Sequence, residues 1–232
     1  MKMKTPGIIG GVAPESTIEY YRFLIASYRD KTQDGNYPPL IINSINMKKM
    51  LDLIGEGKLV EVTDYLVGEI MKLAAAGADF GLLASNTPHI VFEEIRKQSP
   101  IPLISIVESA AEYVKNAGVK VAGLFGTRFT MEAKFYSDVF SKAGINIIIP
   151  DDADREYIHT KYMKELVNGI FNNDTQDRLL DIIQKLVKEY GIQGLILGGT
   201  ELPLILRDTN PGIPLFDTTK IHVEAVVARM LI

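Results

Sequence analysis

The sequence of 232 residues contains no cysteine and only three histidines, His89, His159 and His222. Without cysteine the protein cannot form disulfides, use a thiolate as a nucleophile, or hold zinc or an iron–sulfur centre through sulfur. The three histidines are not spaced like metal ligands, so we expect no metal site and assign each of them to a surface or structural position.

A basic excess and long apolar runs are also absent. The net charge of −4 argues against a nucleic-acid-binding surface. No apolar run approaches the ~20 residues that span a bilayer, and Pro6-Gly7 precedes any hydrophobic stretch long enough for a signal peptide. Hydrophobic residues make up 47% and charged residues 23% of the chain, as in soluble globular proteins. We therefore expect a cytoplasmic protein with no nucleic-acid or membrane partner.

Short apolar runs alternate with amphipathic helical stretches along the whole chain. The predicted strands are residues 7–11, 40–44, 80–84, 102–106, 119–125, 146–149, 194–197 and 213–216. The predicted helices start near residues 14, 60, 90, 108, 131, 156 and 175, and a last helix runs through Met230. Continuous apolar strands separated by helices indicate parallel sheets covered on both faces. The pattern predicts a doubly wound α/β fold.

An internal repeat divides the chain into two halves. The segment from Gly77 to Pro88 matches the segment from Gly191 to Leu202, and an Ile-Pro-Leu tripeptide follows each, at 101–103 and 213–215. We therefore expect two pseudo-symmetric doubly wound parallel-sheet units: residues 1–105 plus about 212–232, and about 106–211. Because open parallel sheets bind ligands at the carboxyl ends of their strands, we expect a ligand cleft between the units.

A polar turn follows the corresponding strand in each half. Ser85-Asn86-Thr87-Pro88-His89 ends one predicted strand directly before a helix, and Gly198-Gly199-Thr200-Glu201 ends the other. Hydroxyl and amide groups beside the free N–H groups of a helix start can bind a carboxylate or a phosphate. Helix capping is the alternative for the first turn alone. The repetition of the turn favours the binding interpretation.

Five blocks, in this order, resemble the aspartate/glutamate racemase family. They are Gly7–Gly11 with Pro14–Thr17, Ser85–His89, Leu124–Met131, Gly198–Leu202 and Ile213–Thr218. The block at 126–131, Gly-Thr-Arg-Phe-Thr-Met, is most similar to the branch that acts on L-aspartate and L-glutamate. The resemblance covers nearly the whole chain. It implies an isomerase that binds an acidic amino acid between two α/β units, uses neither pyridoxal phosphate nor metal, and forms a homodimer.

The resemblance also implies two cysteines that flank the substrate and move the Cα proton. A thiol suits this reaction because its pKa near 8.5 lets thiol and thiolate coexist near neutrality. Ser85 and Gly199 stand at these two positions. A serine hydroxyl without an activating partner is a poor base, and glycine carries no proton. Three explanations stay open: another residue supplies the chemistry, the protein binds without catalysis, or the cysteines were replaced by engineering.

Glu201 is the candidate for a replacement base, as a desolvated carboxylate of raised pKa. A water or a neighbouring side chain would then fill the gap at Gly199. The alternative is that Glu201 orients its surroundings or caps a helix. The candidate substrate-binding residues are Gly11, Asn86, Thr87, Thr127, Arg128, Thr130 and Thr200. For Arg128, a structural ion pair is an equal alternative.

Three functions compete on this basis. The leading hypothesis is an acidic-amino-acid racemase-family protein in which the usual two-thiol mechanism cannot operate. The second is a catalytically inactive binding or regulatory protein for a small dicarboxylate. A decarboxylase or cis–trans isomerase of the same superfamily has no positive support in the sequence. If only the two thiols are missing, Ser85→Cys combined with Gly199→Cys should create racemase activity.

Overall fold

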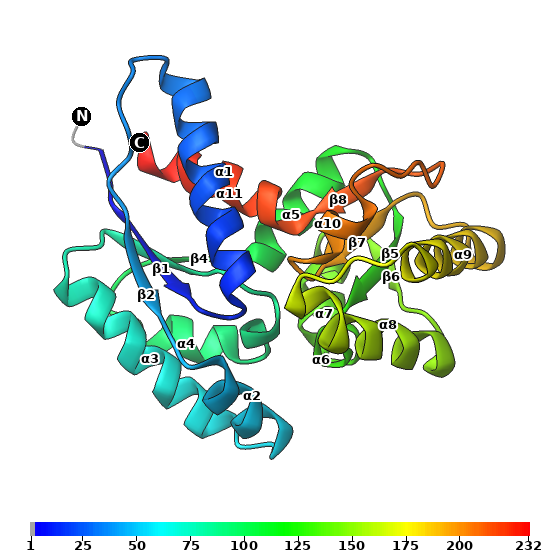
Figure 1. Cartoon of the computed structure of the whole chain (residues 1–232). Coiled ribbons are helices and arrows are strands. Elements are labelled where there is room, and N and C mark those ends of the chain that lie inside the picture. Colours follow the sequence, from blue (N-terminus) through cyan, green and yellow to red (C-terminus); the bar gives the residue numbers. More distant parts are fainter. Residues whose placement is uncertain (1–2) are drawn as a thin grey trace. The chain divides into compact units, whose positions relative to one another are not determined.

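A computed structural model describes residues 3–232 as two compact α/β units (Figure 1). The first unit contains the described residues up to Ile106 together with His222–Ile232, and the second contains Val107–Ile221. Each unit is built on one sheet of four strands. The two sheets have equivalent strand orders, β2-β1-β3-β4 and β6-β5-β7-β8, and all of the strand pairs are parallel. The structure confirms the predicted pair of doubly wound units.

The strands of the first unit coincide with the predicted apolar runs. They are β1 (Pro6–Gly10), β2 (Ile41–Ser44), β3 (Phe80–Leu83) and β4 (Leu103–Ile104). The helices between them are α1 (Pro14–Thr32), α2 (Met47–Gly55), α3 (Leu59–Ala75), the 3-10 helix η1 (Thr87–Val91) and α4 (Phe92–Gln98). β1 and β3 lie in the centre of the sheet, and every residue of both strands is buried.

Helices cover both faces of this first sheet. Ile8 of β1 belongs to a buried cluster with Tyr20 and Leu24 of α1. A Cβ on the preceding residue, Gly7, would lie 3.1 Å from Leu73 of α3. Successive residues of a strand point to opposite faces, so α1 and α3 cover opposite sides of the sheet. This double cover explains why the central strands are apolar without alternation.

The second unit repeats this arrangement. Its strands are β5 (Val121–Gly126), β6 (Asn146–Ile148), β7 (Leu195–Gly198) and β8 (Leu215–Asp217). Its helices are α6 (Arg128–Glu132), α7 (Lys134–Lys142), α8 (Asp152–Lys164), the 3-10 helix η2 (Leu166–Asn168), α9 (Asn173–Tyr190) and α10 (Leu202–Leu206). Phe125, Leu195 and Leu197 pack in one cluster with residues of α8 and α9. Leu124 and Ile196, which alternate with them, are also buried, so the opposite face is covered too.

The last helix of each half belongs to the other unit. α5 (Ile106–Asn116) follows β4 but lies in the second unit apart from its first residue. α11 (Thr218–Met230) follows β8, and from His222 onward it lies in the first unit. The chain therefore returns to the first unit at His222, about ten residues after the expected position near 212. The prediction was wrong for β8 because this strand pairs in parallel with β7.

Three helical regions also differ from the predictions. α2 was not expected, although Asn46 caps it by accepting a hydrogen bond from the Lys49 N–H, and Met50 and Ile54 are buried. The helix expected at 131–143 is divided into α6 and α7 by extended backbone at Ala133. The helix expected at 156–171 starts earlier, at Asp152, because Asp151 caps it, and α8 ends at Lys164.

The packing of α11 predicts where the first unit is sensitive to truncation of side chains. Met230 is fully buried in the cluster with Ile8, Tyr20 and Leu24. Met230→Ala should lower the free energy of unfolding by about 2–5 kcal/mol, because it leaves a cavity. The neighbouring Leu231 is 40% exposed, and Leu231→Ala should change it by less than about 0.5 kcal/mol. Urea unfolding followed by circular dichroism measures both, and equal effects would contradict this placement of α11.

Candidate functional site

At the carboxyl end of β1, Gly11 brings two chain segments into close contact. Its φ angle is +79°, and a Cβ at this position would lie 2.6 Å from the carbonyl oxygen of Ile45 and from Oγ of Ser44. The Gly11 N–H donates to Oγ1 of Thr17 at 2.8 Å. Packing against the end of β2 therefore requires glycine here. Contact between Gly11 and a ligand remains a prediction.

At the carboxyl end of β3, the turn from Ser85 to Thr87 is buried, and the His89 side chain binds its backbone. The backbone N–H of Ile106 donates to Nε2 of His89 at 3.2 Å, and Nδ1 lies 3.0 Å from the Ser85 carbonyl oxygen. Since a carbonyl oxygen only accepts, Nδ1 carries the proton and Nε2 does not. Both ring nitrogens are engaged with the backbone, so His89 positions the turn and is not a base for the Ser85 hydroxyl.

A second neutral imidazole supports the same unit. Nε2 of His222 donates to the Ile104 carbonyl oxygen at 3.1 Å, and the Tyr20 hydroxyl donates to Nδ1 at 2.8 Å. Burial lowers the pKa of His222 to about 4. Burial, with a smaller contribution from His222, lowers the pKa of His89 to about 3. Both rings are therefore uncharged at neutral pH and serve as structural hydrogen-bonding groups.

At the carboxyl end of β5, Thr127 is the N-cap of α6. Its Oγ1 accepts from the Thr130 N–H at 3.2 Å and lies 3.1 Å from Oγ1 of Thr130. The guanidinium of Arg128 forms an ion pair with Glu156 of α8, and the Arg128 N–H donates to Nδ1 of His159 at 3.3 Å. Of the two alternatives for Arg128, the structure shows the ion pair.

At the carboxyl end of β7, the space beside Gly199 is filled by a tyrosine. A Cβ added to Gly199 would lie 2.9 Å from both Cζ and Oη of Tyr162, and closer still to Cε2. Tyr162 comes from α8 and is 6% exposed. Gly199 does not have a positive φ angle, so the neighbouring ring, and not the backbone conformation, excludes a side chain here.

The Tyr162 hydroxyl is bound to Glu201. It donates to Oε2 of this carboxylate, and the Thr200 hydroxyl donates to the same oxygen at 2.9 Å. Glu201 is only 1% exposed. Burial, reinforced by the adjacent Glu201 carboxylate, raises the pKa of Tyr162 well above its usual value of 10.0. The pair is therefore a neutral phenol that donates a hydrogen bond to a buried carboxylate.

Tyr162 is the residue that the sequence analysis missed. The Tyr162 ring is the neighbouring side chain that fills the gap at Gly199. The two residues are 37 positions apart in the sequence, so their contact was not evident from it. The four-residue spacing between Ile158 and Tyr162 indicates that both lie on a buried helix face, but not which strand end that face meets. The contact adds a condition to the prediction that Ser85→Cys with Gly199→Cys creates activity. A cysteine at 199 would collide with Tyr162, so that ring must be shortened as well.

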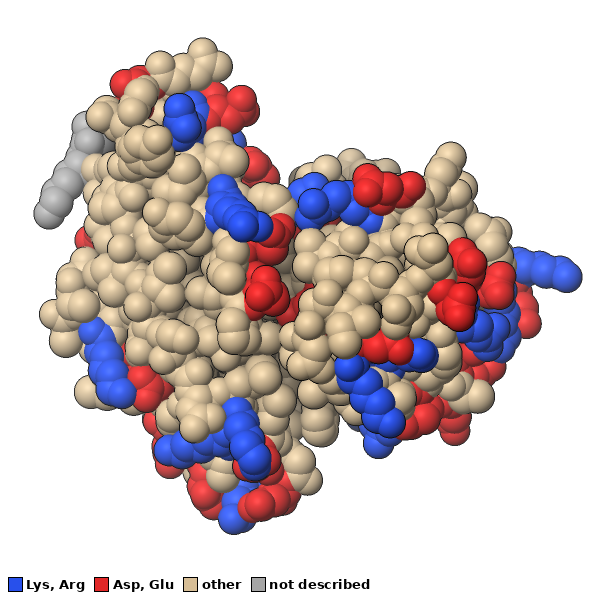
Figure 2. Space-filling model, viewed as in Figure 1, with Lys and Arg blue, Asp and Glu red and all other residues tan. Residues whose placement is uncertain are grey.

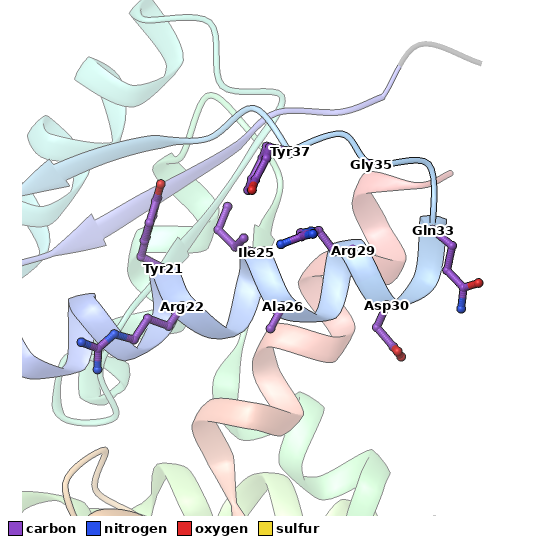
Figure 3. A pocket seen from close by; sticks show the side chains of 9 residues that line it. All are labelled: Tyr21, Arg22, Ile25, Ala26, Arg29, Asp30, Gln33, Gly35 and Tyr37. Atoms are coloured by element: carbon purple, nitrogen blue, oxygen red, sulfur yellow. The ribbon is translucent and has the colours of Figure 1, made fainter.

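One concavity among the described residues lies elsewhere, on the surface of α1. It has a volume of about 810 Å³ and is lined by Tyr21, Arg22, Ile25, Ala26, Arg29, Asp30, Gln33, Gly35 and Tyr37 (Figure 3). The Arg29 guanidinium lies over the Tyr37 ring, 5.2 Å from its centroid. None of the predicted site residues lines this concavity, so it provides no evidence for the predicted site.

The described part of the chain contains neither a cluster of metal ligands nor a membrane-spanning helix. Its His, Asp and Glu side chains nowhere form a group of three or more that could hold a metal ion. None of its helices has both the length and the apolar composition to cross a lipid bilayer. Lysine and arginine are interspersed with aspartate and glutamate over the face shown in Figure 2, without an extended basic stripe.

Comparison with known proteins identifies relatives along the whole chain. A family model described as Asp/Glu/Hydantoin racemase matches residues 9–226. The broad specificity amino-acid racemase RacX of Bacillus subtilis (strain 168) is 25% identical to this chain, and the match covers 97% of each protein.

Two solved structures are similar in both sequence and fold. A candidate Asp/Glu racemase from Yersinia pestis is 34% identical, with a TM-score of 0.91, over 99% of this chain and 100% of that one. An aspartate racemase homologue from Pyrococcus horikoshii OT3 is 33% identical, with a TM-score of 0.86, over 99% and 100% of the respective chains. These similarities extend over both units.

The contact between Gly199 and Tyr162 predicts a strong energetic coupling. Gly199→Ala should destabilise the protein by about 1–3 kcal/mol through overpacking. In a Tyr162→Leu background the same change should cost much less, with a coupling energy of about 0.5–3 kcal/mol. A double-mutant cycle based on urea unfolding measures this coupling. Additive effects of the two substitutions would show that the ring does not fill this space.

The two buried imidazoles predict a loss of stability in mild acid. Both have folded-state pKa values below the unfolded value of about 6.5. The unfolded chain therefore binds more protons, and stability should decline as the pH falls below about 6.5 toward 4 and then 3. His89→Asn keeps a donor for the Ser85 carbonyl oxygen. The free energy of unfolding of this variant should fall less steeply with decreasing pH than that of the wild type. The two slopes should differ by up to about 1.4 kcal/mol per pH unit. Thermal unfolding from pH 7.5 to 4.5 measures the slopes, and equal slopes would contradict the assignment.

Proposed function

Because the chain belongs to the Asp/Glu/hydantoin racemase family, we propose that it binds an acidic amino acid and transfers the proton of its Cα without a cofactor. The observation that carries the proposal is the repetition of a buried polar turn after the equivalent strands β3 and β7. Ligands of open parallel sheets bind at such strand ends. Family membership supports this reaction class, and the turns offer hydroxyl and amide groups that suit a bound acid.

The polar groups at these strand ends suit carboxylates. Asn86 and Thr87 follow β3, Thr127 and Thr130 follow β5, and Thr200 follows β7. Hydroxyl and amide groups donate hydrogen bonds to a carboxylate without adding a full positive charge. An acidic amino acid carries two carboxylates, so several donors at more than one strand end fit its chemistry.

The names of the relatives support an amino acid as the substrate class. RacX is named as a broad specificity amino-acid racemase, and the Pyrococcus horikoshii OT3 protein as an aspartate racemase homologue. We extend the proposal accordingly to aspartate and glutamate. It further includes independence from pyridoxal phosphate and metal ions, a cytoplasmic location and a homodimer.

Hydrogen exchange at Cα tests the proposal directly. L-aspartate and L-glutamate incubated with the protein in D2O should lose the Cα proton signal in NMR spectra faster than in buffer alone. L-alanine, which lacks the side-chain carboxylate, should exchange no faster than in buffer. Calorimetric titration with the same amino acids measures binding separately. Saturable binding without exchange would favour the inactive binding protein, and no binding of either acid would overturn the proposal.

A further inference from the structure

We infer that the phenol of Tyr162, paired with the Glu201 carboxylate, is the acid/base of the proposed reaction and works from one side of Cα. This inference rests on the proposed function, because it requires an acidic amino acid to bind at the strand ends. It identifies the group that moves the proton and predicts the stereochemical outcome. A side chain at position 199 is not needed in this mechanism.

The geometry places the phenol where residue 199 would otherwise project. Cζ and Oη of Tyr162 both lie 2.9 Å from the position of a Cβ on Gly199. Gly199 directly follows β7, at the carboxyl edge of the sheet, where ligands of such sheets bind. The absence of a side chain at 199 and the presence of the ring are thus two halves of one arrangement. A side chain of α8 thereby occupies the position that a side chain at residue 199 would take.

The hydrogen bonds define how a proton can move through the pair. The Tyr162 hydroxyl donates to Oε2 of Glu201, so the phenol starts as the donor and the carboxylate as the acceptor of this hydrogen bond. When the Cα–H bond breaks, its electron pair stays on the substrate as an enolate, and the proton passes to Oη of Tyr162. The phenolic proton moves at the same time to Oε2 of Glu201. The reverse transfer restores Cα–H, so the step needs no oxidant, reductant or additional reactant.

The ends of β3 and β5 provide no equivalent acid/base, and Asp217, which ends β8, accepts hydrogen bonds from the backbone N–H groups of Thr219 and Lys220 and caps α11. After β3, the His89 ring is engaged at both nitrogens with the backbone and cannot activate Ser85. After β5, the polar side chains are the hydroxyls of Thr127 and Thr130, the Arg128 guanidinium, which pairs with Glu156, and the His159 ring, whose Nδ1 accepts from the Arg128 N–H. Hydroxyls, a permanent cation and a neutral imidazole whose acceptor nitrogen is already hydrogen-bonded are poor proton acceptors at neutral pH. With one acid/base, the proton leaves from and returns to the same side.

The test compares deuterium incorporation with inversion. Each enantiomer of aspartate and glutamate is incubated with the full-length protein in D2O, and NMR and chiral chromatography follow the two processes. One enantiomer should gain deuterium with its configuration retained, and racemisation should be at least tenfold slower than exchange. Tyr162→Phe should lower the exchange rate by about 100-fold or more, the range of a lost general acid/base. It should change the dissociation constant for the amino acid by less than threefold.

Two further variants separate proton transfer from packing. Glu201→Gln keeps an acceptor for the Tyr162 hydroxyl but cannot take up its proton, so exchange should fall while binding and folding persist. Tyr157→Phe changes a tyrosine five residues earlier on α8, outside the proposed machinery, and should leave exchange unchanged. Exchange that survives Tyr162→Phe, or racemisation as fast as exchange, would overturn the inference while the proposed function stands. Binding without any exchange would overturn the inference and the catalytic part of the proposed function. No binding of either acid would overturn both.

Discussion

The Tyr162 phenol can occupy the end of β7 only because residue 199 has no side chain. This steric exclusion determines the chemistry available at that strand end. The Tyr162 hydroxyl provides one of the hydrogen bonds that the buried Glu201 carboxylate requires. Thr200 provides another. A cysteine at 199 would remove the space for the ring and deprive Glu201 of the Tyr162 hydroxyl.

The strand ends differ in what supports them, although the two sheets have equivalent strand orders. The turn after β3 depends on a neutral imidazole whose two nitrogens bind backbone groups at Ser85 and Ile106. The turn after β7 depends on a phenol and a carboxylate from side chains. The first support is a ring bound only to backbone groups, and the second is a pair of ionisable side chains bound to each other. Equivalent positions in a repeat can therefore acquire unequal chemistry without a change of fold.

The fold and the position of the candidate site could be predicted from the sequence to different extents. Runs such as Phe80–Leu83 and Leu195–Gly198 show their strands directly, because buried parallel strands are apolar without interruption. The repeat likewise identifies Ser85 and Gly199 as equivalent. The return of the chain to the first unit at His222 could not be predicted from the sequence, because it depends on the pairing of β8 with β7. Tyr162 was equally hidden, since helical spacing shows that a residue is buried but not which strand end it meets.

The passage of α11 into the first unit has a consequence during synthesis. The ribosome completes β1 to β4 long before it makes Val223, Val226, Val227 and Met230, which cover Ile8 and Tyr20. The 115 intervening residues, Val107–Ile221, take roughly 6–23 s to synthesise at about 5–20 residues per second. For that time one face of the first sheet and the partner face of α1 lack their final cover. The nascent chain thus carries an exposed apolar surface that a chaperone could shield until its last dozen residues emerge.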